Sequence, residues 1–173
     1  MMAGSVSEGR WFVARVRSGH ELKMRDRLRE LGVRNYIPSR EVTRVRGHKR
    51  CKVEAPVIPN LIFLFCPKPQ AFALANGYGL PLKYLIDHST RTLLEVPAKQ
   101  LEDFIRVMEE DPSTLCPPDQ VFHPGQKVRV VAGNLAGVEG EVEMLPNRTF
   151  LTISVCGLLR ARIQIPRAYV KAI

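Results

Sequence analysis

The longest uninterrupted apolar segment of the chain lies at residues 61–66, where six hydrophobic residues follow one another. This segment is too short to cross a membrane, which takes about 20 residues. A run of this length without alternation is typical of a strand buried on both faces at the centre of a sheet. Proline has no amide hydrogen for the ladder, so Pro59 is expected at the start of this strand. Val57 and Ile58 then lie where the sheet opens toward the surface, and core packing is the alternative for them.

The preceding segment predicts a strand and an amphipathic helix. Residues 11–16 form a strand pattern, and Ser18 with Glu21 three residues later predicts a capping box at the start of a helix. Apolar residues at positions 24, 28 and 31 form one helical stripe, and Gly32 ends it. The opposite face is basic and carries Lys23, Arg25, Arg27 and Arg29.

Residues 33–38 predict a second strand, and residues 40–52 follow as a strongly basic segment. This segment holds seven basic residues, counting His48, and one acid, with Gly47 near its middle. We predict a basic hairpin with a glycine turn. A mobile polar loop is the alternative.

The rest of the first 110 residues predicts helices around further strands. Pro69 opens a short helix that ends at residues 76–77, and residues 82–86 and 91–96 are strand candidates. Pro97 begins a helix whose apolar residues recur at i, i+3, i+4 and i+7, so we expect this helix to pack on the same sheet. Hairpins mixed with helices predict a mainly antiparallel sheet flanked by helices, an α+β domain.

The last third of the chain has a different sequence pattern, without an amphipathic helix. Residues 111–120 contain three prolines without periodicity and predict a linker. Residues 121–173 show short alternating strands separated by turn signals, which predicts a small SH3-like β-barrel. The expected organisation is a disordered N-terminus (1–9), an α+β domain (10–110), the linker (111–120) and the barrel (121–173).

Charge is concentrated in the first third of the chain. Of the net charge of +9, residues 1–66 contribute 14 Lys/Arg against 6 Asp/Glu. Such a focused positive field attracts phosphate backbones, although a solvated basic surface gives the same composition. The four cysteines form no CxxC pair and no convincing disulfide framework, which favours reduced thiols in the cytoplasm. The N-terminus does not resemble a signal peptide, and no segment reads as a transmembrane helix.

Motifs for catalysis and for cofactor or metal binding are absent from the sequence. It contains no P-loop, GxSxG or HExxH, and its four histidines are scattered. We therefore expect a protein that is not an enzyme and needs no cofactor and no metal.

Residues 125–142 resemble a KOW motif, a module of nucleic-acid-linked machinery. Gly133 and Gly137 are expected to turn the chain after the first strand, and Gly140 to permit close approach of two backbones. The matching positions are Gly125, Val128, Val130, Gly133, Gly137, Gly140 and Val142.

The N-terminal part resembles the first domain of the NusG family of transcription elongation and antitermination factors. The matching features, in order, are Trp11-Phe12, residues 18–21, Ile37-Pro38, the basic hairpin and residues 56–63. The Pro59-Asn60 pair is more similar to the operon-specific RfaH and UpxY paralogues than to general NusG, where glycine is usual.

The resemblance implies binding to the β′ clamp helices of RNA polymerase and to nucleic acid, as a monomer and without a membrane. The clamp-helix patch carried over is Ile58, Pro59, Asn60, Leu61 and Phe63, with Tyr84 as its aromatic neighbour. The implied contacts to non-template DNA come from Arg17, His20, Lys23 and Arg27, and nascent RNA is a further implied partner. The hairpin residues are expected to add to the positive field and to contacts with upstream duplex DNA: Arg44, Arg46, Lys49 and Arg50.

The barrel departs from the family pattern at two places, one that bears on its contacts and one that weakens the match to the KOW motif. Cys156 stands where NusG presents a phenylalanine, which argues against contact with Rho or ribosomal protein S10, and Asn134-Leu135 replaces the usual Pro-Phe of the KOW loop. The alternative function is a KOW-type RNA- or ribosome-binding protein acting in translation.

Overall fold

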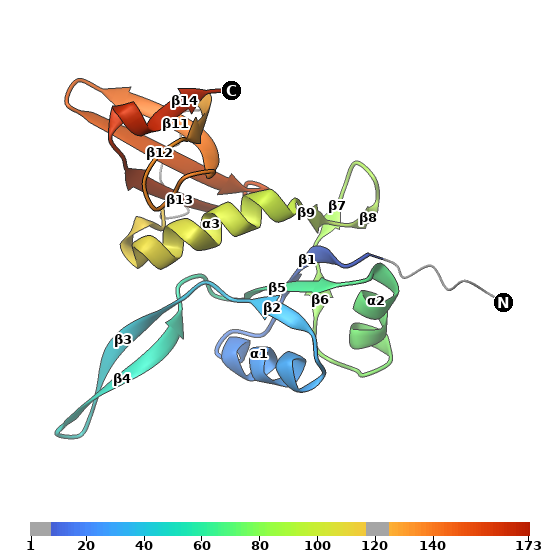
Figure 1. Ribbon diagram of the computed structural model, residues 1–173. Helices are drawn as coiled ribbons and strands as arrows, with labels where there is room; N and C mark the ends of the chain where they lie inside the picture. Colours follow the sequence, from blue (N-terminus) through green and yellow to red (C-terminus); the bar gives the residue numbers. More distant parts are fainter. Residues whose placement is uncertain (1–7, 117–124) are drawn as a thin grey trace. The chain divides into compact units, whose positions relative to one another are not determined.

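The computed structural model describes residues 8–116 and 125–173 of the chain (Figure 1). The chain divides into two compact units, residues 1–96 and 97–173. Most of the segment predicted to be a disordered N-terminus, residues 1–7, lies outside the described residues.

The first unit is built on an antiparallel sheet with the predicted apolar strand at its centre. Strand β5 lies between β2 and β1, and β6 and β9 pair with the other edge of β1. This placement explains the unbroken apolar run, because a central strand has neighbours on both edges and buries side chains on both faces. The bounds are β1 Arg10–Arg15, β2 Arg34–Tyr36, β5 Leu61–Cys66, β6 Lys83–Tyr84 and β9 Glu95–Val96.

Two helices, α1 (Glu21–Glu30) and α2 (Lys68–Asn76), pack on one face of this sheet. Met24 and Leu28 of α1 and Leu74 of α2 join Phe12 and Ile62 of the strands in one core. Gly32 follows α1 with φ of +72°, the left-handed conformation that ends many helices. The predicted stripe and stop of this helix are therefore confirmed.

The predicted capping box of α1 is not formed. His20 occupies the N-cap without a side-chain hydrogen bond, and the helix starts at Glu21. The carboxylate of Glu21 is buried and accepts the Asn60 N–H instead. Glu21 thus bonds to a residue distant in sequence instead of closing the predicted capping box with Ser18. Residue spacing within the helix does not reveal such a contact.

Two smaller hairpins complete the first unit. Strands β3 (Ser39–Arg46) and β4 (Lys49–Pro56) form the basic hairpin, joined by a two-residue turn in which Gly47 has φ of +60°. Figure 1 shows this hairpin as an arm extending beyond the body of the first unit. The second hairpin pairs β7 (Ile86–Asp87) with β8 (Thr92–Leu93).

The second unit holds a five-stranded antiparallel sheet in the order β13-β12-β11-β10-β14. Strands β13 and β14 are consecutive in the chain but lie at opposite edges, which are about 19 Å apart in a flat sheet. They are joined by only five residues, three of them in the short 3-10 helix η2 (Arg167–Tyr169), so the sheet must curl as a small barrel does. The bounds are β10 Gln126–Val130, β11 Glu139–Leu145, β12 Arg148–Val155, β13 Leu159–Gln164 and β14 Val170–Ala172. The predicted α+β first part and all-β second sheet are both confirmed.

Helix α3 (Ala98–Glu110) differs from its expected place. The sequence predicts that it packs on the first sheet, whereas the structure packs it on β12 and β13 of the second unit. Its buried face holds Leu101, Phe104, Val107 and Met108. The chain then continues along β13 through the 3-10 turn η1 (Pro112–Thr114) and the bridge between Leu115 and Ala161. An apolar stripe shows that a helix buries one face, but it does not say against which sheet.

The compact units therefore divide at Val96 and Pro97, ahead of the predicted linker at residues 111–120. Residues 117–120 of that linker lie outside the described part of the chain. Within residues 8–116 and 125–173, no helix is both long enough and apolar enough to span a membrane.

Candidate functional site

The segment that enters β5, residues 57–60, is called here the strand entry. Its backbone is fixed at both ends, because Val57 N–H donates to Pro38 O at 2.9 Å and Val16 N–H donates to Asn60 O at 3.0 Å. Asn60 has φ of +67°, a conformation that asparagine and glycine adopt more readily than other residues. Asparagine is therefore one of the few residues that this turn accepts at little steric cost.

A buried acid ties the strand entry to the start of helix α1. Glu21 is only 4% exposed, and its Oε1 accepts the Asn60 N–H at 3.0 Å. The strand entry and the beginning of the basic helix are therefore neighbours in the first unit. Glu21 and Asn60 are 39 residues apart in the sequence, so no local pattern predicts this bond.

The expected clamp-helix patch is only partly brought together. Ile58 and Asn60 are half-buried and Pro59 is exposed, so all three lie at or near the surface of the strand entry. Leu61 and Phe63 are buried, with 4% and 0% of their surface exposed. The accessible part of the predicted patch is thus Ile58, Pro59 and Asn60, of which Ile58 and Pro59 are apolar.

Tyr84, expected as the aromatic neighbour of the patch, does not lie beside Phe63. Directly paired residues share one face of a sheet, and Tyr84 pairs with Ala14 while Phe63 pairs with Val13, so the two rings lie on opposite faces. Tyr84 packs against the core on the helix side, where burial raises the pKa of its hydroxyl well above the usual value. The ring near Phe63 is that of Tyr36 on β2, at 6.4 Å. The sequence could not identify Tyr36, because the choice depends on the register of β2 against β5.

The expected basic residues of the first helix share one region. Arg17, His20, Lys23 and Arg27 are all exposed, and they run from the end of β1 along α1. Spacings of three and four residues place the last three on one side of the helix. Arg27 pairs with Glu30 at 3.0 Å, whereas no hydrogen bond or ion pair of Lys23 occurs among the described residues.

The expected basic residues of the hairpin do not all face the same way. Arg44 pairs with Cys51 and Arg46 with Lys49, and these pairs lie on one face of the ribbon. Arg50 pairs with Val45 on the opposite face. The register thus separates Arg50 from the other three.

The glycines of the KOW motif have the conformations that the sequence predicts. Gly133 and Gly137 have φ of +79° and +90° and turn the loop between β10 and β11. A Cβ on Gly140 would lie 2.5 Å from the Thr152 carbonyl oxygen, so only glycine allows this approach of β11 to β12. The side chains of Val128, Val130 and Val142 are buried, whereas Gly125 lies at the exposed start of β10.

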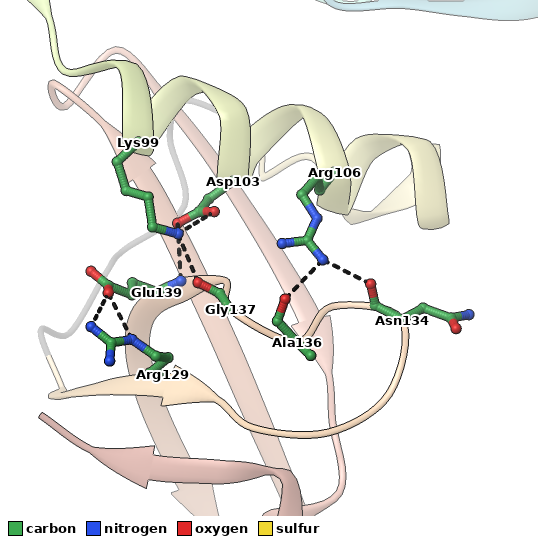
Figure 2. Close-up of polar contacts among 8 residues, drawn as sticks. All are labelled: Lys99, Asp103, Arg106, Arg129, Asn134, Ala136, Gly137 and Glu139. Carbon is green, nitrogen blue, oxygen red and sulfur yellow. Dashed lines mark hydrogen bonds and ion pairs between the residues drawn. The ribbon is translucent and has the colours of Figure 1, made fainter.

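Helix α3 binds the loop between β10 and β11 through backbone atoms, as Figure 2 shows. Lys99 Nζ donates to Gly137 O at 2.7 Å, and Arg106 Nη2 donates to the carbonyl oxygens of Asn134 and Ala136, both at 2.9 Å. Asp103 is buried and accepts the Glu139 N–H at 3.0 Å while it pairs with Lys99. Sequence reasoning named none of these charged residues and missed their role.

Two further interactions accompany the contact between α3 and the loop: a bond from Cys156 to α3 and an ion pair between Arg129 and Glu139. Cys156 has φ of +48°, and its N–H donates to Gln100 Oε1 at 3.1 Å, so α3 also holds the turn between β12 and β13. Arg129 bonds to Glu139 at 2.6 Å and holds the pKa of that carboxyl below its ordinary value. The position where NusG presents a phenylalanine is thus occupied by a residue bonded to the chain's own helix.

Comparisons with known proteins gave one family match and similarity to solved structures. Residues 9–76 match the family described as NusG, transcription termination factor nusG. A comparison with curated protein sequences found no match. Among solved structures, the chain is similar to NusG of Thermotoga maritima, in a structure titled "Domain interaction in Thermotoga maritima NusG", with 16% identity and a TM-score of 0.49 over 98% of this chain and 99% of that chain. The family match spans β1, α1, the hairpin, the strand entry, β5 and α2, so the first unit contains a NusG-family domain.

Proposed function

We propose that the chain is an operon-specific elongation or antitermination factor that binds RNA polymerase and nucleic acid through adjacent surfaces of its first unit. The polymerase surface is the strand entry, with Ile58 and Pro59 against the β′ clamp helices. The nucleic-acid surface is the end of β1 and the exposed side of α1, which touches the non-template strand.

The observation that carries this proposal is the bond between Asn60 and Glu21. It fixes an apolar turn and a basic helix next to each other in the first unit. A transcribing polymerase presents a protein coiled coil and exposed nucleic acid side by side, so a factor that binds both needs such a juxtaposition. A general basic surface would not require a neighbouring apolar turn.

The polymerase contact is tested by Ile58→Asp in the full chain. Burial of a side chain of this size contributes roughly 1.5–3 kcal/mol, which corresponds to at least about tenfold in affinity. A buried charge would add a further penalty, so we expect Ile58→Asp to lose polymerase in co-purification. The thermal melt should change little, because the side chain is half-buried.

A matched control is Phe72→Asp on α2, where an apolar side chain is 45% exposed outside the strand entry. This control should retain polymerase. If Ile58→Asp unfolds the protein, Ile58 belongs to the core, and if the folded variant still binds polymerase, the contact lies elsewhere.

The nucleic-acid contact is tested by Lys23→Glu combined with Arg27→Glu. Each phosphate neutralised adds about 0.7–0.9 to the slope of log affinity against log salt. The variant should therefore bind elongation complexes more weakly and with a shallower salt dependence. Unchanged binding without salt dependence would contradict an electrostatic contact at α1.

The translation alternative receives no support from the family match, which lies at residues 9–76 and outside the KOW segment. A role for the barrel in binding Rho or ribosomal protein S10 is not proposed. Cys156 replaces the phenylalanine of that contact and is bonded to Gln100.

A further inference from the structure

The two faces of the β3–β4 hairpin differ in charge. Residues that pair directly share a face, and successive pairs alternate between faces. One face carries four basic residues and no acid, and it is called here the cationic face: Arg40, Arg44, Arg46 and Lys49. The other face carries two acids and two bases, and it is called the balanced face: Glu41, Arg50, Lys52 and Glu54.

Of the two faces of the hairpin, only the balanced face forms ion pairs with the residues that the structure describes. Lys52 pairs with Glu41 at 3.0 Å, and Glu54 accepts bonds from Arg25 of α1 at 2.7 Å and from Ser39 at 2.5 Å. The four side chains of the cationic face are exposed. Arg46 and Lys49 are directly opposite each other, an arrangement that destabilises a hairpin unless an anion lies between the charges.

The base of the hairpin is held in a fixed orientation. The Arg25 guanidinium and the Ser39 hydroxyl hydrogen-bond to Glu54, keep its pKa below the ordinary value and fasten the balanced face to α1. At the base of the hairpin, the cationic face is therefore turned away from this helix. The cationic face is a second basic surface, separate from the one on α1.

The dimensions of the cationic face fit one kind of nucleic acid. Arg40 and Arg46 are six residues apart on one strand, about 20 Å, or the rise of about six base pairs. The major groove of B-form DNA is about 12 Å wide and admits a two-stranded β-ribbon. The major groove of A-form RNA is too deep and narrow for side chains to enter.

We propose that the cationic face of the hairpin binds duplex DNA, with the ribbon in or along the major groove and its four basic side chains on the phosphates. Arg50, on the balanced face, takes no part in this contact. The inference rests on the proposed function for the location of the duplex beside the polymerase, whereas the binding itself can be measured without polymerase.

The test compares two double variants of equal charge in the full-length chain. Arg44→Ala/Arg46→Ala removes two charges from the cationic face, and Arg50→Ala/Lys52→Ala removes two from the balanced face. Binding to a fluorescent duplex DNA of about 20 base pairs is followed by anisotropy across a salt series. Melting curves confirm that both variants fold, since these side chains are exposed.

The cationic-face variant should lose about tenfold or more in affinity, and its salt slope should fall by about 1.8. The balanced-face variant should stay within about threefold of the parent chain and keep its slope. Equal losses of affinity in both variants would show that net charge alone attracts DNA. Unchanged affinity in both variants would show that the hairpin does not contact DNA. Tighter binding to double-stranded RNA or to a single strand, lost in the cationic-face variant, would assign the face to another ligand.

The duplex-binding experiment and the Ile58→Asp experiment together separate this inference from the proposed function. If Ile58→Asp releases polymerase while Arg44→Ala/Arg46→Ala leaves duplex binding intact, the function stands and the hairpin proposal is wrong. If the cationic-face variant loses duplex DNA while Ile58→Asp retains polymerase, the hairpin site stands and the proposed polymerase contact is wrong.

Discussion

Helices α1 and α3 have similar sequence patterns and use their charged sides differently. Each has an apolar stripe and an opposite side rich in charge. On α1, Lys23 and Arg27 are exposed, and the ion pair of Arg27 stays within the helix. On α3, Lys99, Asp103 and Arg106 bond to backbone atoms of the loop between β10 and β11.

This difference shows what a hydrophobic stripe does not predict. The stripe identifies the buried face of a helix, whereas the role of the charged side depends on which backbone atoms the fold brings near it. On α1, Lys23 and Arg27 remain available to a partner, whereas Arg25 bonds to Glu54 of the hairpin. The charged side of α3 supplies bonds to carbonyl oxygens that the loop itself leaves without partners.

The largest expected effect tests whether α3 is part of the second folded unit. A fragment of residues 97–173 should melt at a higher temperature than a fragment of residues 119–173. Four buried apolar side chains of α3 each contribute roughly 1.5–3 kcal/mol, and a net difference of 2–3 kcal/mol shifts Tm by roughly 10–20 °C for a unit of this size. Circular dichroism should show a helical signal in the longer fragment and a β-type spectrum in the shorter one.

Identical melting temperatures for the two fragments would contradict the packing of α3 on β12 and β13. That result would support the boundary at residues 111–120 that the sequence predicts. A helical spectrum from residues 119–173 would instead indicate that the barrel changes fold when it is free.

A smaller effect is expected from Asp103→Ala in the full chain. The substitution leaves the Glu139 N–H without its acceptor, at a cost of about 1–3 kcal/mol, and removes the ion-pair partner of Lys99, which keeps its bond to Gly137 O. Hydrogen exchange at the Glu139 amide should accelerate accordingly. Glu102→Ala, on the exposed side of the same helix, is the control and should leave this exchange rate unchanged.

The smallest expected effect concerns pH and the attachment of the hairpin to α1. The Arg25 bond and then the Ser39 bond lower the pKa of Glu54 below its ordinary value of 4.5. The stabilisation is therefore complete above about pH 4.5 and is lost as pH falls through the lower pKa of the folded state. Exchange of hairpin amides should increase in that acidic range, and Glu54→Gln should remove this pH dependence. Because Glu54 is 44% exposed, solvent screening keeps the effect small.

The sequence predicted the first sheet well because its signals are local. Residues 61–66 form the central strand, residues 40–52 lie in a hairpin, and Gly32 follows the end of α1, each from patterns within a few residues. The place of α3 could not be predicted this way, because Leu101 and Phe104 would be equally buried against either sheet. The missing capping box has the same cause, since Glu21 bonds to a residue 39 positions away.

The site residues could be predicted only in part, because the sequence does not specify how neighbouring strands pair. Alternation along a single strand places Leu61 and Phe63 on one face of β5 and Ile62 and Leu64 on the other, as the pairing with β1 shows. Whether Tyr84 or Tyr36 lies beside Phe63 depends on how β6 pairs with β1 and β2 with β5, which the sequence does not specify. The same limit grouped Arg50 with Arg44 and Arg46, which the hairpin register separates.

The most direct test of the proposed polymerase contact is a photo-crosslinking amino acid at position 58 of the full chain. Irradiation in a complex with RNA polymerase should attach the chain to the coiled coil of the β′ subunit, and the same amino acid at position 72 should give no such adduct. Mass spectrometry of the adduct identifies the peptide that was reached. Absence of a polymerase adduct from the folded, labelled protein, or adducts with ribosomal proteins in a mixed extract, would contradict the proposal that the strand entry binds RNA polymerase.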